Sequence, residues 1–520
     1  MTFNIFLAAF WQQRPVLFAL LLISIFLSFF LNLHAVPLFD LDEGAFSEAT
    51  REMFERGDFI STYLNGQPRY DKPILIYWLQ AASVAVFGVN EFAFRLPSAI
   101  MAGIWVMVIF FWVSRFTNVT TGFFAALITA TTLEVTVIGR AATADALLNC
   151  IITATMLTLF GYYRERRKTW LYLAFALMGL GFLTKGPVAV VIPAVVSGLF
   201  CLLRGQWRFW LQSVFNVRGM VLFLVIALPW YVVQTIKEGW PFIEGFFLRH
   251  NVERFSEPMH GNSGALFYYV PVVLVAVIPY TAVLLAALTR VRSLWRDDLF
   301  LFCMLWFGFV LLVFSFSGTK LPHYILYGLP GLFILMADRI QSLKSHGAAL
   351  SVPLVFFVCL LFLPELLGLA LKTVDDDFLR ARLAGYEDYV GWGYRLFFLA
   401  AIALCVAAIV RRPLPVGPSL GVAGAASVVS MGLFVVPLVA QLLQQPLKEA
   451  GELVRGKPWT VVMWGMNTPS FSVYARRVVE KRRPEAGEVV LTKTTRLERL
   501  GAHEVLYAKH GIVLARVASP

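Results

Sequence analysis

The hydropathy of this chain constrains its fold more than any other feature, because long apolar runs alternate with short polar links over most of its 520 residues. A helix needs roughly 20 apolar residues to cross a hydrocarbon core of about 30 Å. About 13 runs approach that length, at 15–34, 95–114, 120–138, 145–162, 170–184, 187–203, 219–236, 266–289, 299–316, 323–338, 349–370, 394–410 and 418–441. With 59% hydrophobic residues, the chain has too much apolar surface for a soluble globule. We therefore predict a polytopic all-α membrane protein.

The formal net charge of +12 does not indicate nucleic-acid binding, because the basic residues fall in short clusters between the apolar runs. That distribution is typical of membrane topology signals. We find no nucleic-acid motif in the sequence. The five cysteines lie inside apolar runs, which argues against disulfides and against cysteine-bound metals.

One further run, residues 74–88, decides the orientation of the others. As a helix it would reach only about 22 Å, which is short of the hydrocarbon core. If it does not cross, nearly every short basic loop lies on the side of the N-terminus, as the positive-inside rule requires. We therefore predict a juxtamembrane helix at 74–88, a cytoplasmic N-terminus and an external C-terminus.

Polar chemistry is concentrated between residues 39 and 97. Residues 43–56 place apolar and charged side chains on opposite faces of a helix, and Gly57 follows as a stop signal. This pattern predicts an amphipathic helix lying flat in the membrane interface, with Asp42 as its N-cap. Asp42 either serves only as a cap or also takes part in chemistry.

The predicted topology gathers many polar residues on the external face, where they would line one outward-facing cavity. They are Asp42 and Glu43; Arg69, Asp71 and Lys72; Arg140, Thr143 and Asp145; Lys185; Arg249, His250, Arg254, His260 and Asn262; and Lys320, His323 and Tyr324. A single charge at a helix end is more often an interfacial anchor, but convergence on one face favours a site. Lys185 is the clearest case, because its tight turn needs Gly and Pro but no lysine. Glu134 is a further candidate for the same cavity.

After residue 442 the sequence becomes polar and mixed. Strand-like segments at 460–464, 489–491, 504–508 and 512–517 alternate with helical patterns at 469–480 and 495–500. We predict two domains, a transmembrane domain at 1–442 and a small external α/β domain at 443–520. The smaller domain has no phosphate-binding loop, and we interpret it as a packing or acceptor-docking module.

An external site rich in carboxylates and cations, without a Ser-His-Asp triad, an HExxH motif or a Walker loop, suits transfer of a group from a lipid-linked phosphate. The cations would stabilise the departing phosphate, and a carboxylate would accept the proton of the attacking hydroxyl. The sequence requires no cofactor, although a divalent metal held by Asp71 with His260 or His250 is an alternative. The rival class is a lipid transporter or flippase, for which inverted repeats would be expected. We find no such repeats.

Several stretches occur in one order on this topology: DLDEGAFSEATREM, LNGQPRYDKPILIYWLQA, FGVNEFAFRLPS, GRAATADALLN, FLTKGPVAVVIP and KLPHYILYGLPG. They resemble the GT-C membrane glycosyltransferases of the protein O-mannosyltransferase clan, and most closely the bacterial lipid A aminoarabinose transferases. The resemblance covers residues 35–340, with a weaker likeness at 467–477. It implies a GT-C protein of the bacterial inner membrane, with a periplasmic active site and a periplasmic C-terminal domain. It also implies a polyprenyl-phosphate sugar as donor and inverting transfer to lipid A or another envelope glycan. A protein O-glycosyltransferase of the same clan is the alternative.

The resemblance also implies roles for individual residues. Asp42, together with Glu43, resembles the catalytic or acceptor-orienting acid of the first external loop, and Asp145 resembles the acid of the second. The residues expected to hold the donor phosphate are Lys72, Arg69, Lys185 and Lys320. Where aminoarabinose transferases have Arg-Tyr after the acid pair, this chain has Ala45 and Phe46, so one phosphate contact is missing. A relative that uses another sugar or another acceptor is therefore an equal alternative.

Overall fold

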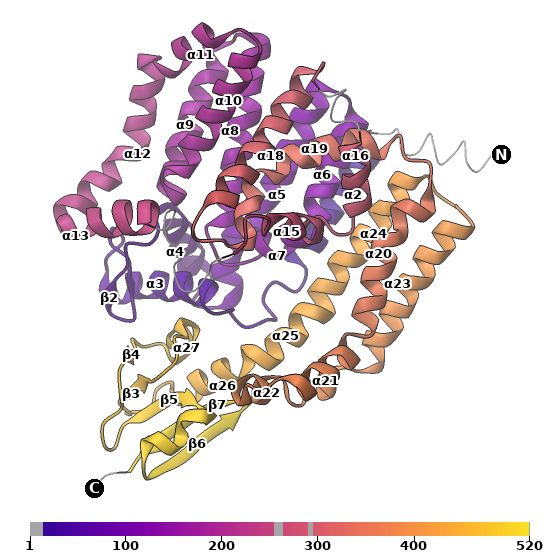
Figure 1. The fold of residues 1–520 in the computed structure, drawn as a ribbon. Helices are drawn as coiled ribbons and strands as arrows, with labels where there is room; N and C mark the ends of the chain where they lie inside the picture. The colour runs from indigo at the N-terminus through magenta and orange to yellow at the C-terminus, as the bar shows by residue number, and fades with distance from the viewer. Residues whose placement is uncertain (1–13, 254–263, 290–294, 519–520) are drawn as a thin grey trace.

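The computed structural model describes residues 14–253, 264–289 and 295–518. Most of these residues are helical, and the long helices pack side by side into a bundle (Figure 1). The helices up to residue 443 are α2 (Arg14–Ile25), α3 (Asp42–Arg56), α4 (Leu75–Phe87), α5 (Glu91–Phe116), α6 (Val119–Thr131), α7 (Leu133–Gly139), α8 (Asp145–Glu165), α9 (Lys168–Lys185), α10 (Val188–Leu203), α11 (Trp207–Val214), α12 (Val217–Glu238), α13 (Trp240–Ile243), α15 (Tyr269–Ala276), α16 (Thr281–Leu288), α18 (Asp298–Phe316), α19 (Leu329–Ile340), α20 (His346–Leu361), α21 (Leu363–Thr373), α22 (Asp377–Leu383), α23 (Trp392–Val410), α24 (Val416–Ser430) and α25 (Val436–Leu443). A two-stranded hairpin, β1 (Tyr63–Leu64) and β2 (Gln67–Pro68), lies between α3 and α4.

Within the described ranges, six helices are long and apolar enough to cross a membrane: α5, α8, α12, α18, α23 and the stretch 416–443 that contains α24 and α25. Two bent pairs raise this number to eight, since α6 and α7 meet at 66° and α20 and α21 at 60°. Shorter apolar helices occupy 14–30, 75–87 and 188–203. The predicted multi-pass helical architecture is confirmed, whereas the count of 13 spans and the interfacial position of α4 stay predictions.

Three apolar runs that the sequence suggests as single helices are interrupted. Thr132 has an extended backbone between α6 and α7. Pro364 stands in the first turn of α21, directly after the bend, and Pro279 separates α15 from α16. Proline lacks an N–H group and its ring clashes with the preceding helical turn, which favours a break at Pro279 and Pro364. Pro97, Pro193, Pro229 and Pro353, in contrast, lie inside continuous helices. Hydropathy alone therefore overestimates the continuity of these helices.

Residues 445–518, the C-terminal segment, fold around a five-stranded sheet. The strands lie in the order β4 (Glu480–Lys481), β3 (Val461–Met463), β5 (Val489–Lys493), β7 (Ile512–Val517) and β6 (His503–Lys509). β3 runs parallel to both of its neighbours, and the other pairs are antiparallel. Two helices, α26 (Gln445–Val454) and α27 (Pro469–Ala475), share a buried apolar core with the sheet. Strands β3, β5, β6 and β7 stand where the sequence predicts strands. The predicted helix at 469–480 is too long, because α27 ends at Ala475 and β4 occupies Glu480–Lys481, and the sequence pattern does not predict α26. The domain boundary at 443 stays a prediction.

α3 differs most from its prediction. Residues 43–53 are all buried, so most of its charged face does not lie at a surface, as it would in an interfacial helix, and only Glu55 and Arg56 of that face are exposed. α27 of the C-terminal segment packs against α3 and contributes to this burial (Figure 1). The predicted cap is also wrong, because α3 begins at Asp42 itself, its N-cap is Leu41, and no side chain caps it. Gly57 ends the helix in the left-handed conformation, in agreement with the predicted stop.

Candidate active site

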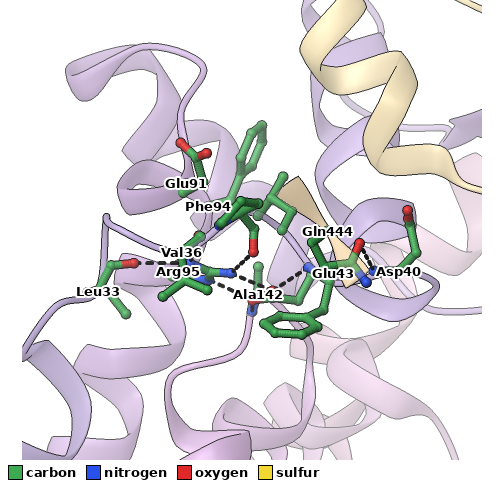
Figure 2. Close-up of polar contacts among 12 residues, drawn as sticks. Leu33, Val36, Asp40, Glu43, Glu91, Phe94, Arg95, Ala142 and Gln444 are labelled. Atoms are coloured by element: carbon green, nitrogen blue, oxygen red, sulfur yellow. Dashed lines mark hydrogen bonds and ion pairs between the residues drawn. The ribbon is translucent and has the colours of Figure 1, made fainter. Parts of the chain in front are cut away.

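Asp42 lies exposed at the start of α3, and the loop that precedes it is held by Arg95 from the first turns of α5. The Arg95 guanidinium is buried and donates hydrogen bonds to three backbone carbonyls of this loop (Figure 2). The acceptors are Leu33 at 3.1 Å, Val36 at 2.6 Å and Pro37 at 2.8 Å. A buried arginine thus fixes the path of the chain that leads into Asp42.

Glu43 completes this network. Its Oε1 accepts from Arg95 Nε at 2.8 Å and from the Ala142 amide at 2.7 Å, and its Oε2 accepts from Arg95 Nη2 at 2.6 Å and from the Phe39 amide at 2.9 Å (Figure 2). Burial alone would raise the pKa of Glu43, but the charge and hydrogen bonds of Arg95 and the two amides hold it below its ordinary value. The ionised Glu43 therefore joins α3, α5 and the link that leads into α8. This is the geometry of a residue that positions the loop.

Asp145, the second predicted acid, begins α8 and is buried. Lys185, the last residue of α9, donates to Asp145 Oδ1 at 2.6 Å and to the phenol oxygen of Tyr327 at 2.8 Å. The Tyr327 hydroxyl in turn donates to the same Asp145 oxygen at 3.3 Å. The structure therefore brings together two residues that the sequence places in separate external loops.

The stretch 69–72 lies between Asp42 and Asp145 and interacts with both through Arg69 and Lys72. Lys72 Nζ lies 2.7 Å from one Asp71 oxygen, and Arg69 Nη2 lies 3.1 Å from the other. Lys72 also interacts electrostatically with Asp145, as does His323, while Arg69 interacts electrostatically with Asp42. One short stretch of chain thus carries positive charge toward both acids.

The Arg69 guanidinium is buried and incompletely bonded. Among the residues that the structure describes, its Nε and Nη1 groups have no hydrogen-bond partner. The guanidinium carbon of Arg69 lies over the aromatic ring of Phe46, 5.1 Å from the ring centroid. Although burial opposes its charge, Tyr77 and Asp71 keep the pKa of Arg69 above its ordinary value. Arg69 thus keeps two N–H groups for acceptors that the described residues do not supply, and phosphate oxygens are acceptors that a guanidinium binds well.

Lys320 and Glu134 lie near this region. Lys320 is buried and donates to the Ser317 carbonyl at 2.8 Å, just before the 3-10 helix Pro322–Tyr327 that carries His323 and Tyr327. Glu134 of α7 interacts electrostatically with Asp145. Both of its carboxylate oxygens are buried, and neither has a hydrogen-bond partner within the described part of the chain.

The described residues do not form a set of ligands for the predicted metal site at Asp71. Asp71 already engages Arg69 and Lys72, and His260 lies outside the described residues. In the ranges that the structure covers, no three His, Cys, Asp or Glu side chains are grouped to hold a metal ion. The pairing of Asp71 with His260 stays a prediction.

Sequence reasoning missed Arg95 and Tyr327. A signal for Arg95 was present, because a charge at the start of an apolar run needs a buried partner or a route to water. For Tyr327 no local signal distinguishes it from the other tyrosines, since its role depends on the meeting of α9 with the 3-10 helix.

Comparison with known proteins gives a consistent picture. Residues 71–232 match the family model described as dolichyl-phosphate-mannose-protein mannosyltransferase. An undecaprenyl phosphate-alpha-4-amino-4-deoxy-L-arabinose arabinosyl transferase of Yersinia enterocolitica is 31% identical over 363 residues, which are 66% of this chain and 64% of the relative. An uncharacterized protein of Aquifex aeolicus is 31% identical over 324 residues, which are 62% of this chain and 73% of that protein. The chain thus spans slightly less than two thirds of the Yersinia relative.

Solved structures show the same fold. ArnT from Cupriavidus metallidurans, in a crystal structure bound to undecaprenyl phosphate, gives a TM-score of 0.80 at 20% identity and covers 97% of this chain and 99% of that one. The apo oligosaccharyltransferase of Archaeoglobus fulgidus gives 0.51 at 12% identity over 91% of this chain and 65% of that one. The chain therefore shares the fold of this class of multi-pass membrane proteins. Within that class the chain belongs to the family of the aminoarabinose transferases and their relatives, as the motifs predict.

Proposed function

We propose that this protein transfers a sugar from a polyprenyl phosphate to an acceptor of the bacterial cell envelope, with lipid A as the first candidate. The relative from Yersinia carries the name of an undecaprenyl-phosphate-dependent arabinosyl transferase, and the ArnT structure holds undecaprenyl phosphate. On the predicted topology the N-terminus is cytoplasmic, while the site and the C-terminal segment face the periplasm.

The observation that carries the proposal is the row of cations between two acids. Arg69 offers two buried, unsatisfied N–H groups, and Lys72 and Lys185 both interact with Asp145. Positive groups fixed in a buried site stabilise charge that accumulates on a leaving group, which is often the largest single contribution to catalysis. A lipid phosphate is the leaving group that such a row fits. Aminoarabinose transferases have an arginine at the position of Ala45, where this chain lacks a phosphate contact. Arg69, which lies over the ring of Phe46, supplies that contact instead.

The reaction is a single displacement. The oxygen of the acceptor attacks the anomeric carbon as the bond from that carbon to the phosphate oxygen breaks, and the configuration inverts. The electron pair of the broken bond remains on the polyprenyl phosphate, where Arg69, Lys72 and Lys185 stabilise it. The proton of an attacking hydroxyl passes to the exposed carboxylate of Asp42.

The two other predicted acids take supporting roles in this scheme. Glu43 positions the loop, since each of its oxygens already accepts two hydrogen bonds. Asp145 orients Lys185 through their 2.6 Å contact. Lys320 lies next to the segment that carries His323, where it adds positive charge to the donor side of the site.

Lipid mass spectrometry tests the proposal. Membranes from cells with the gene, without it, and with an Asp42→Asn version at matched expression are compared. Loss of a sugar-sized mass from one envelope glycolipid, restored by the wild type but not by Asp42→Asn, supports it. Unchanged glycolipids with a changed glycoprotein would instead favour the protein O-glycosyltransferase. Full restoration by Asp42→Asn would refute the role of that carboxylate.

A further inference from the structure

The C-terminal segment reaches the loop that carries Asp42 at several points. The hydroxyl of Tyr474 in α27 accepts from the Leu38 amide at 2.7 Å. Gln444, the residue directly before the segment, accepts with its Oε1 from the Asp40 amide at 3.4 Å (Figure 2). Both partners come from more than 400 positions away in the sequence. The loop is therefore held by Arg95 on one side and by the C-terminal segment on the other.

Asp40 adds two further hydrogen bonds to these contacts. Its carboxylate accepts from the Ser470 amide at 2.9 Å and from the Ser470 hydroxyl, so it satisfies a free N–H in the first turn of α27. Helix N-termini leave several such groups without a partner, and an aspartate is among the best residues to bind them. Here the aspartate belongs to the catalytic loop and the helix to the C-terminal segment.

Gly44 makes this approach sterically feasible. A Cβ atom at this position would lie 2.1 Å from Asp40 Oδ1 and 2.6 Å from the Ser470 nitrogen. Real Cβ atoms do not come that close, so the first turn of α3 and the first turn of α27 meet only because residue 44 has no side chain. Gly44 is two residues from Asp42, and the contact is thus built into the same turn.

We propose that Asp40 and Ser470 form a loop clamp through which the C-terminal segment positions Asp42 for catalysis. This proposal rests on the proposed function, because it takes Asp42 as the acid that meets the acceptor. No side chain caps α3 at its N-cap, so the place of Asp42 depends on the backbone that the clamp fixes together with Arg95. A displacement of about 1 Å in a catalytic group can lower the rate about a hundredfold. The C-terminal segment is then a part of the active site, beyond a packing or docking module.

The clamp predicts a separation of kcat from KM. The residues that face the donor phosphate, Arg69, Lys72 and Lys185, come from other parts of the chain and form their ion pairs with Asp71 and Asp145, not with Asp40. Asp40→Ala removes both acceptors, so we expect kcat to fall about a hundredfold while KM for the donor changes less than twofold. Ser470→Ala removes only one of the two hydrogen bonds, and a smaller loss of about tenfold is expected. Asp40→Asn retains the acceptor for the Ser470 amide, and should keep kcat within about threefold of the wild type.

The experiment uses the full-length protein in detergent, with undecaprenyl phosphate carrying 4-amino-4-deoxy-arabinose as donor and lipid A as acceptor. Asp375→Asn, an exposed carboxylate in the link before α22, is the matched control and should leave both constants unchanged. Hydrogen exchange of residues 36–44 and 468–475 follows the contact directly, and should accelerate in Asp40→Ala but not in the control.

Each outcome decides the matter. Accelerated exchange with a selective loss of kcat, and rescue by Asp40→Asn, supports the clamp. Wild-type kcat in Asp40→Ala overturns it, as does an Asp40→Asn variant as inactive as Asp40→Ala, since the charge of the carboxylate would then act in the chemistry. If the wild type itself transfers no sugar, this donor sugar and acceptor are the wrong pair. Exchange then still tests the contact between loop and C-terminal segment, and unaltered exchange in Asp40→Ala overturns the clamp on its own.

Discussion

Replacing Arg95 by methionine gives a sharp test of how the active-site loop is held. The variant keeps a side chain of similar length but leaves the buried carboxylate of Glu43 without its cation, and it also removes the donors to three backbone carbonyls. Removing one partner of a buried ion pair costs about 3–5 kcal/mol, because the remaining charge stays in a low-dielectric environment. We therefore expect a large fall in the midpoint of thermal unfolding and loss of transfer activity.

Arg115 provides the matched control. It forms an ion pair with Glu165 at 2.7 Å, also between two helices, but its side chain is 50% exposed, against 6% for Arg95. Exposed pairs contribute about 0–1 kcal/mol, so Arg115→Met should unfold close to the wild-type temperature. The assay is thermal unfolding of both variants in the same detergent. Equal midpoints for Arg95→Met and Arg115→Met would refute the assigned role of the buried pair.

Three further predictions concern the site and its surroundings. Lys185→Met removes the cation that pairs with Asp145 and that stabilises the departing phosphate, so the rate of polyprenyl phosphate release should fall at least about a hundredfold. Retention of half the wild-type rate would contradict this. Gly44→Ala forces a Cβ to within 2.1 Å of Asp40 Oδ1 and should lower the unfolding temperature, whereas Gly347→Ala, with nothing within 4 Å, should not; equal effects of the two changes would argue against the close approach. Burial raises the pKa of Asp40 to about 7, so the folded protein keeps this proton where the unfolded chain has lost it, and stability falls as the pH rises from about 4 to 7. Thermal unfolding at pH 5 and 7.5 should show this slope in the wild type and a smaller one in Asp40→Asn; identical slopes would exclude Asp40 as the group responsible.

Much of the architecture could be read from the sequence because hydropathy in a membrane protein is a strong local signal. The apolar runs contain helices, and the positive-inside rule places Asp145 and Lys185 on one face although 40 residues separate them. Their 2.6 Å contact agrees with that inference. Four of the five strands of the C-terminal segment, all except β4, also follow from local sequence patterns, which act over a few positions.

The features that escaped prediction depend on contacts between distant parts of the chain. Arg95 meets Glu43 across 52 residues and Asp40 meets Ser470 across 430, and neither spacing leaves a periodic trace. The charged face of α3 suggested a surface, but the C-terminal segment packs on it and Arg51 neutralises Glu48 within the helix. Amphipathicity indicates that two faces differ, yet it does not tell whether the polar face meets water or protein.

The most direct test of the central claim measures the fate of the donor. Purified protein is reconstituted in liposomes with an undecaprenyl-phosphate-linked sugar and lipid A, and both lipids are analysed by mass spectrometry. The account predicts that the wild type releases free undecaprenyl phosphate and adds one sugar to the acceptor, and that Asp42→Asn does neither. A donor that remains chemically intact while it crosses the bilayer, or an Asp42→Asn variant that turns over at the wild-type rate, would contradict it.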